Sequence, residues 1–154
     1  MITDKQLKTI RQEVKLRMSN AKNPLHQMDH IHDVVENAQE LTYLLNLEDK
    51  IDLNLLLAAC YLHDLTYASN PFFLKAYIFE GKLVQKPAQQ VLESANVQLP
   101  EKQAILHALK NHPHSFPFKS LNKDQDLYSS LLQDADTIDV FDEDRLKKLF
   151  HSFG

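Results

Sequence analysis

The amino-acid sequence predicts an all-α protein, and three observations support this fold class. Apolar residues recur at helical spacing along most of the 154 residues. The chain holds only two glycines, Gly81 and Gly154, so a series of tight β-hairpins is not expected. No segment is predicted to be a strand. We therefore expect one domain, residues 1–154, folded as a bundle of about six to eight helices.

The composition narrows the class of protein. Apolar residues make up 44% of the chain, enough for a folded core, and the net charge is −4 with no basic stripe, so no nucleic-acid polymer is expected as a partner. The longest apolar run, residues 55–62, is too short to cross a bilayer, and residues 1–19 lack the apolar core of a signal peptide. The lone cysteine, Cys60, cannot form an intrachain disulfide. We expect a cytoplasmic protein that does not bind membranes.

The first helix is expected at residues 4–18, and Thr3 or Asp4 can cap its N-terminus. Its apolar residues recur at helical spacing: Leu7, Ile10, Val14 and Met18. The segment 20–24, which ends in a proline, interrupts the helical pattern. This helix is expected to pack on a core formed by residues 26–140.

A longer helix is expected at residues 26–47. One of its faces is apolar: Ile31, Val34, Val35, Ala38, Leu41 and Leu45. His30 lies at the edge of this face, because apolar residues follow it by four and by eight positions. His32 points the opposite way, toward solvent. His26 lies one turn before His30 and could reach the same region.

The most apolar segment, residues 53–65, is expected to be a helix buried on all sides, with Asp52 as its cap. Two polar residues, His63 and Asp64, stand near its end. On one interpretation the helix simply reaches solvent there. On the other, a buried carboxylate beside an imidazole needs a positive partner, and a metal ion satisfies both groups. Further ligands elsewhere in the chain decide between the two.

Prolines and apolar spacing indicate more helices in the second half. Residues 72–79 are expected to form a short aromatic-rich helix that stops at Gly81, and Pro87 can start the next helix. The helix that starts at Pro100 ends near His112. That histidine can cap the helix C-terminus as an imidazolium or take part in a site, and the spacing leaves both roles open.

A loop is expected at residues 114–123, a final core helix at residues 124–140 and a tail helix at residues 142–153. The final core helix has a set of inward apolar residues: Leu127, Leu131, Leu132, Ala135 and Ile138. It also carries three carboxylates: Asp134, Asp136 and Asp139. One of these carboxylates can join His30, His63 and Asp64 at one end of a bundle. Two imidazoles and two carboxylates suit a divalent transition metal such as Mn²⁺, Fe²⁺ or Co²⁺.

The order of these residues resembles the HD superfamily of metal-dependent phosphohydrolases, whose ligand pattern is H…HD…D. The resemblance covers about residues 26–140 and is carried by four segments in order: 29–38 (DHIHDVVENA), 56–65 (LLAACYLHDL), 105–112 (ILHALKNH) and 132–139 (LQDADTID). It implies an HD-domain-like helical fold. It also implies four metal ligands: His30, His63, Asp64 and Asp136.

The choice of Asp136 as the last ligand rests on the resemblance. By periodicity alone, Asp134 and Asp139 lie nearer the apolar face of the helix than Asp136 does. We expect Asp134 to support the ligands from behind without binding the metal itself.

The resemblance implies one divalent ion, which could be Mn, Fe, Co or Mg, with Zn or Ni as alternatives. A single ion is expected because the two-metal branches carry an extra histidine after the HD pair. No histidine stands between Asp64 and Ile105 in this chain.

The implied reaction is hydrolysis of a phosphate ester of a nucleotide or another small phosphorylated metabolite. Asp64 and His112 are the expected catalytic residues, and His112, Lys110 and His26 are the expected substrate-binding residues. The sequence is compatible with a homo-oligomer and does not specify one.

Two other functions stay open. Many members of the superfamily carry a lysine shortly after the HD pair, where this chain has Leu65, Thr66 and Tyr67, and Asp33 stands where an arginine is frequent. A domain that binds a metal and a nucleotide as a sensor, without turnover, is therefore an alternative. An iron-dependent oxygenase on the same scaffold is a second alternative, although the number of histidines argues against a diiron site.

Overall fold

The computed structural model describes residues 1–19, 28–68, 73–113 and 124–140. Over these residues it contains seven α-helices, one 3-10 helix and no strand, which confirms the all-α prediction. The elements follow in this order: α1 (Asp4–Met18), α2 (Met28–Leu44), α3 (Leu53–Leu62), η1 (His63–Ala68), α4 (Phe73–Leu83), α5 (Gln85–Ser94), α6 (Leu99–Asn111) and α7 (Leu127–Val140). The predicted tail helix at residues 142–153 lies outside the described residues.

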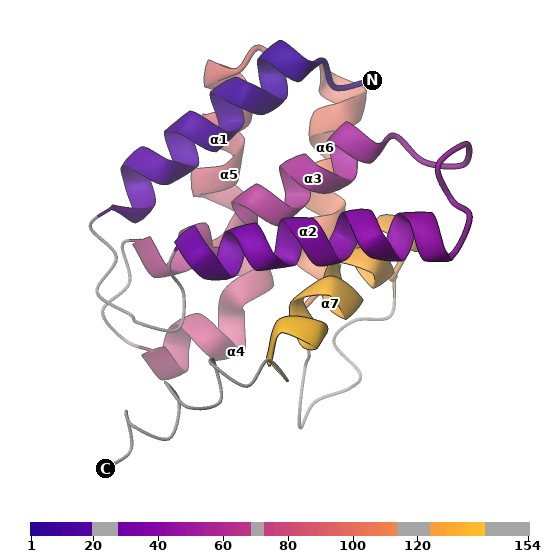
Figure 1. Ribbon diagram of the computed structural model, residues 1–154. Coiled ribbons are helices and arrows are strands. Elements are labelled where there is room, and N and C mark those ends of the chain that lie inside the picture. The colour runs from indigo at the N-terminus through magenta and orange to yellow at the C-terminus, as the bar shows by residue number, and fades with distance from the viewer. Residues whose placement is uncertain (20–27, 69–72, 114–123, 141–154) are drawn as a thin grey trace.

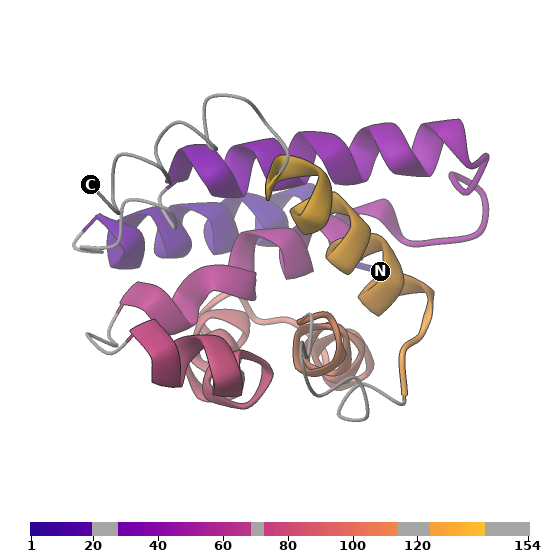
Figure 2. The ribbon, with the colours of Figure 1, turned by 90° about the horizontal axis from the view of Figure 1, so that it is seen from below.

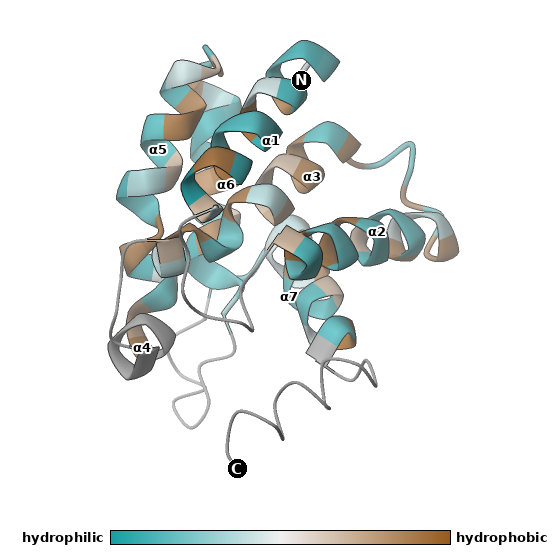
Figure 3. Ribbon diagram, turned by 60° about the vertical axis from the view of Figure 1, so that its left-hand side comes forward, coloured by the Kyte–Doolittle hydropathy of each residue, from teal (hydrophilic) through white to brown (hydrophobic). Residues whose placement is uncertain are grey.

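The central element is α3, the helix predicted to be buried on all sides. Every residue from Leu55 to Leu62 is buried, and α3 packs against α1, α2, α6 and α7. It runs behind α2 in Figure 1 and lies between the α1–α2 side and the α5–α6 side in Figure 2. Figure 3 shows α3 mostly in pale and brown colours, among helices that carry much more teal. Burial of apolar surface drives folding, and α3 contributes a continuous run of buried residues to the core.

Local signals in the sequence place the starts of the helices. Thr3 and Gln6 form a reciprocal capping box at α1, so the predicted cap is confirmed. The predicted Asp52 cap of α3 is also confirmed, since its side chain accepts from the backbone N–H of Leu55 at 3.2 Å. The start of α7 is later than predicted, because Asp126 accepts from the N–H of Ser129 at 2.8 Å and caps a helix that begins at Leu127.

Three predicted helix ends were wrong. Helix α2 ends at Leu44 and not at residue 47 as predicted. Asn46 takes a positive φ of 53° in the turn that follows. The α-helix of α3 stops at Leu62 and tightens into the 3-10 helix η1. Gly81 does not stop α4, which continues to Leu83.

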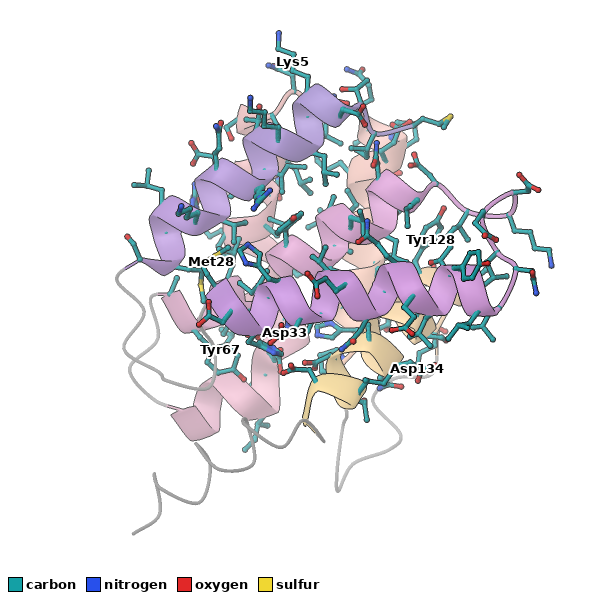
Figure 4. The ribbon with its side chains drawn as sticks, in the orientation of Figure 1. Lys5, Met28, Asp33, Tyr67, Tyr128 and Asp134 are labelled. Carbon is teal, nitrogen blue, oxygen red and sulfur yellow. The ribbon has the colours of Figure 1, made fainter. Side chains whose placement is uncertain are left out.

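The start of α2, the ends of α6 and α7, and the α3–η1 junction meet at one side of the bundle. Helix α7 packs along α2, where the Asn37 side chain donates to the carbonyl of Ala135 at 3.1 Å. Helix α7 also packs on α6, where the Gln133 side chain donates to the carbonyl of His112 at 2.8 Å. The charged side chain of Lys5 lies on the outer side of α1, away from this meeting point (Figure 4). Among the described residues, no helix is long and apolar enough to span a membrane.

Candidate metal centre

The meeting point of these elements brings four predicted ligands together. His30 stands in the first turn of α2, His63 and Asp64 begin η1, and Asp136 lies on α7. The Nε2 atoms of His30 and His63 are 3.2 Å apart. One nitrogen each from His30 and His63 and one oxygen of Asp136 all lie within 4.8 Å of one another, so these three residues could hold a metal ion.

The carboxylate of Asp64 lies beside both imidazoles. Its Oδ2 is 3.2 Å from His30 Nε2, and its Oδ1 is 3.4 Å from His63 Nε2. Asp136 Oδ1 is 3.3 Å from His30 Nε2 and 3.8 Å from His63 Nε2. His30, His63 and Asp64 are buried, whereas the side chain of Asp136 is 25% exposed. The cluster therefore reaches solvent on the side of α7.

In both imidazoles, Nδ1 contacts an acceptor outside the cluster and Nε2 faces the cluster. His63 Nδ1 is 2.7 Å from the carbonyl oxygen of Cys60, so this nitrogen donates and carries the hydrogen. His30 Nδ1 is 2.6 Å from Asp139 Oδ2, which fixes its hydrogen in the same way. In a neutral ring the hydrogen then lies on Nδ1, and Nε2 presents a lone pair toward the cluster.

This arrangement fits a divalent ion. Two lone pairs that face each other at 3.2 Å repel, unless a proton or a cation lies close to both. Ligand atoms about 2.1 Å from one common ion are separated by about 3.0–3.4 Å in octahedral or tetrahedral geometry. His30 Nε2 lies within this range of both His63 Nε2, at 3.2 Å, and Asp136 Oδ1, at 3.3 Å. His63 Nε2 and Asp136 Oδ1 are farther apart, at 3.8 Å. Asp64 approaches the two histidines through different oxygens, Oδ2 toward His30 and Oδ1 toward His63.

The charges around the cluster also favour a cation. Burial alone lowers the pKa of His30, but the carboxylates of Asp64 and Asp136 outweigh it and raise that pKa to about 9. At His63, in contrast, burial outweighs the two carboxylates and lowers the pKa. Burial alone raises the pKa of Asp136, but the neighbouring His30 and His63 hold it at about 2. The two carboxylates thus favour a positive charge at His30 Nε2, carried by a proton or by a metal ion.

His112, predicted as a catalytic and substrate-binding residue, lies next to the cluster. Its ring meets the ring of His63 edge-on, with centroids 5.7 Å apart, and it is fully buried. Its Nδ1 donates to the carbonyl of Leu109 at 2.9 Å, and its Nε2 lies 3.6 Å from Glu80 Oε1. Burial lowers the pKa of His112, but the Glu80 carboxylate reverses this effect and raises it.

Other predicted site residues do not join the cluster. Lys110 is exposed on α6, and His26 lies outside the described residues. Asp134, expected behind the ligands, is exposed on α7 (Figure 4). The carboxylate that supports His30 is Asp139, because the helical turn of α7 carries it inward while Asp134 faces solvent.

Two residues near the centre were not predicted from the sequence: Asp139 as the partner of His30, and Glu80 in any role. The position of Asp139 near the apolar face of its helix was a usable signal. Glu80 had no such signal, because its neighbours in the sequence suggested the end of a helix at Gly81. Tyr67, which stands where a lysine is frequent, is buried, and its hydroxyl lies 3.5 Å from Glu80 Oε2.

The fold and the cluster define an all-helical domain with a His–Asp centre that could hold a divalent metal. The family model described as the HD domain matches residues 28–140, and the chain belongs to the HD superfamily. The resemblance noted in the sequence is thereby confirmed. That the clustered side chains bind a metal stays a prediction.

A solved structure shares this fold. The chain is similar to the crystal structure of a protein described as a predicted HD superfamily hydrolase, from an uncultured Thermotogales bacterium. The TM-score is 0.70 with 20% sequence identity, over 94% of this chain and 74% of the other. None of the curated proteins compared with the chain matches it.

Proposed function

We propose that the protein is a metal-dependent hydrolase that cleaves a phosphate ester of a nucleotide or another small phosphorylated metabolite. The observation that carries this proposal is the pair of imidazole Nε2 atoms, 3.2 Å apart, that the carboxylates of Asp64 and Asp136 flank. A divalent ion bound there would lower the pKa of a water molecule and polarise a phosphoryl oxygen. Membership of the HD superfamily is consistent with a hydrolase.

Each residue of the cluster has a separate proposed role. His30, His63, Asp64 and Asp136 hold the ion. Asp64 also orients the attacking water and accepts its proton. It is suited to this role because it is buried and its two oxygens lie close to the Nε2 atoms of His30 and His63, where the ion would bind. The partly exposed side of Asp136 is the proposed direction of substrate approach. His112, held beside His63, is proposed to bind the phosphate or assist the leaving group.

The proposed metal is one divalent ion. Mixed nitrogen and oxygen donors favour Mn²⁺, Fe²⁺ or Co²⁺, with Mg²⁺, Zn²⁺ and Ni²⁺ as alternatives. These ions differ in geometry and acidity, so metal analysis of the purified protein is the first measurement.

The test combines metal content with turnover. Phosphorylated metabolites are screened with Mn²⁺ or Co²⁺ for the unaltered protein and for His63→Ala and Asp64→Ala. Both variants are expected to lose metal and turnover together, whereas Asp134→Ala, altered at an exposed position of α7, should keep both. Unchanged hydrolysis by a chelated, metal-free sample would contradict the proposal.

A sensor that binds metal and nucleotide without turnover is the second candidate. It is favoured by the buried Tyr67, which lies after the HD pair where a basic residue could otherwise meet a phosphate. Metal uptake and a thermal shift with a nucleotide, without hydrolysis of any phosphate ester, would support the sensor over the hydrolase.

A further inference from the structure

A buried carboxylate outside the predicted ligand set faces His112, the histidine next to the cluster of four predicted metal ligands. Glu80 lies on α4, is buried, and places its Oε1 3.6 Å from His112 Nε2. Its second oxygen, Oε2, lies 3.5 Å from the hydroxyl of Tyr67. A buried carboxylate is costly unless polar or positive groups meet it, so this arrangement calls for an explanation.

The neighbouring glycine explains how Glu80 comes so close to His112. A Cβ at Gly81 would collide with the carbonyl oxygen of Lys110, so α4 and α6 cross at a distance that only a glycine permits. Lys110 stands two residues before His112 on the same chain segment. The close crossing therefore brings the residue before Gly81 to the end of α6, where His112 lies.

The other sides of His112 are already held. Its Nδ1 donates to the Leu109 carbonyl at 2.9 Å, its own carbonyl accepts from Gln133 at 2.8 Å, and its ring meets His63 edge-on. Its Nε2 is buried and makes no direct hydrogen bond within the described structure. A separation of 3.6 Å from Glu80 is too long for a direct hydrogen bond and suits charge attraction or a shared water molecule.

We propose that Glu80 is a positioning residue for His112, and that Gly81 makes this contact possible. Glu80 holds the imidazole of His112 in one orientation beside the predicted metal ligands. In this orientation Nδ1 donates to the Leu109 carbonyl and Nε2 points toward the Glu80 carboxylate. This inference rests on the proposed function, in which His112 acts on the substrate. Asp64 is the nearer carboxylate to the cluster, since its oxygens lie 3.2 and 3.4 Å from the two ligand nitrogens, so Glu80 is not assigned as the base.

The first measurement is independent of turnover. Imidazole N–H signals are recorded by nitrogen-15 NMR on the Mg²⁺-loaded protein, with His112→Gln used to assign the His112 signal. The Nδ1–H bonded to Leu109 is buried, so it should give a protected signal in the unaltered protein. Glu80→Ala should abolish or broaden that signal, whereas Lys82→Ala, an exposed change on the same helix, should leave it intact. An unchanged signal in Glu80→Ala would overturn the positioning role.

The second measurement follows turnover of a phosphate ester. Glu80→Gln keeps the shape of the side chain and removes its charge. We expect kcat to fall about 10- to 100-fold, by analogy with the carboxylates that orient the histidine ligands of metal sites. Metal content should change little, because the four predicted metal ligands are untouched. The double variant Glu80→Gln/His112→Gln should lose no more than His112→Gln alone.

Two kinetic outcomes would reject the inference. Losses that multiply in the double variant would show that Glu80 acts independently of His112. A loss in Tyr67→Phe as large as that in Glu80→Gln would assign the effect to the other partner of the carboxylate. If the unaltered protein cleaves no phosphate ester, the proposed function fails, and the NMR measurement still decides whether Glu80 orients His112.

Discussion

His30 Nδ1 lies 2.6 Å from Asp139 Oδ2, in a buried contact between the first turn of α2 and the last turn of α7. Since the two residues are 109 positions apart, the contact depends on the packing of α7 along α2. A carboxylate behind an imidazole fixes the ring hydrogen on the outer nitrogen and makes the inner nitrogen a stronger ligand. Asp139 is therefore expected to determine how strongly His30 Nε2 binds an ion.

The first prediction concerns that partner. Asp139→Asn keeps a polar group near His30 but removes the negative charge, so metal affinity should fall about 10- to 100-fold. Competition titration with a chelator of known affinity measures the change. Asp134→Asn is the matched control, because it removes the same charge from an exposed position of the same helix. Equal losses in both variants would indicate a general effect of charge and not the contact with His30.

The roles of the three aspartates on α7 show what the sequence could predict. Helical periodicity indicated that Asp134 and Asp139 lie nearer the apolar face, and the structure buries only Asp139 of these two. The resemblance to a family selected Asp136, which the structure brings to the two imidazoles. A single helix cannot reveal which of its inward carboxylates meets a histidine on another helix, because that depends on how the two helices cross.

The second prediction is that metal affinity rises with pH. Carboxylates raise the pKa of His30 to about 9, so below that pH the ring holds a proton that must leave before Nε2 can bind the ion. The pKa of His63 is lowered, so this ring is already neutral and releases none. Displacement of one proton predicts about a ten-fold gain in affinity per pH unit up to about pH 9.

Calorimetric titration with metal in two buffers of different ionisation enthalpy measures this proton release. The apparent binding enthalpy should differ between the buffers by the value for one proton at neutral pH. Identical enthalpies, together with an affinity that does not vary between pH 6.5 and 8.5, would contradict the assignment of His30 as a proton-holding ligand.

The third prediction links metal to stability. An ion that binds the folded cluster and not the unfolded chain stabilises the fold by about 2.7 kcal/mol when its free concentration is 100 times Kd. Thermal unfolding with increasing Mn²⁺ should therefore show a rising midpoint. His63→Ala should lose this dependence, because it removes one of the two nitrogens of the cluster. A midpoint that rises equally in the variant would place the bound ion elsewhere.

The fold was predicted more fully than the site because its signals are local. The buried character of α3, the Thr3 capping box and the Asp52 cap all depend on residues close in the sequence, and each is confirmed. Gly81 was misassigned because a glycine can end a helix or permit a close crossing, and only the partner helix distinguishes the two. The same crossing hid Glu80, whose role depends on a residue 32 positions away in the sequence.

The last prediction tests that crossing through Gly81→Ala. Within a helix, alanine is favoured over glycine by about 0.8–1.0 kcal/mol, which alone would stabilise the variant. The new Cβ would collide with the Lys110 carbonyl, a backbone atom that cannot rotate away, and overpacking of this kind costs about 1–3 kcal/mol. We expect the cost of the collision to exceed the gain in helix propensity, so urea unfolding should give a lower free energy of unfolding for Gly81→Ala than for the unaltered protein. A variant as stable as the unaltered protein would mean that α4 and α6 can separate at little cost.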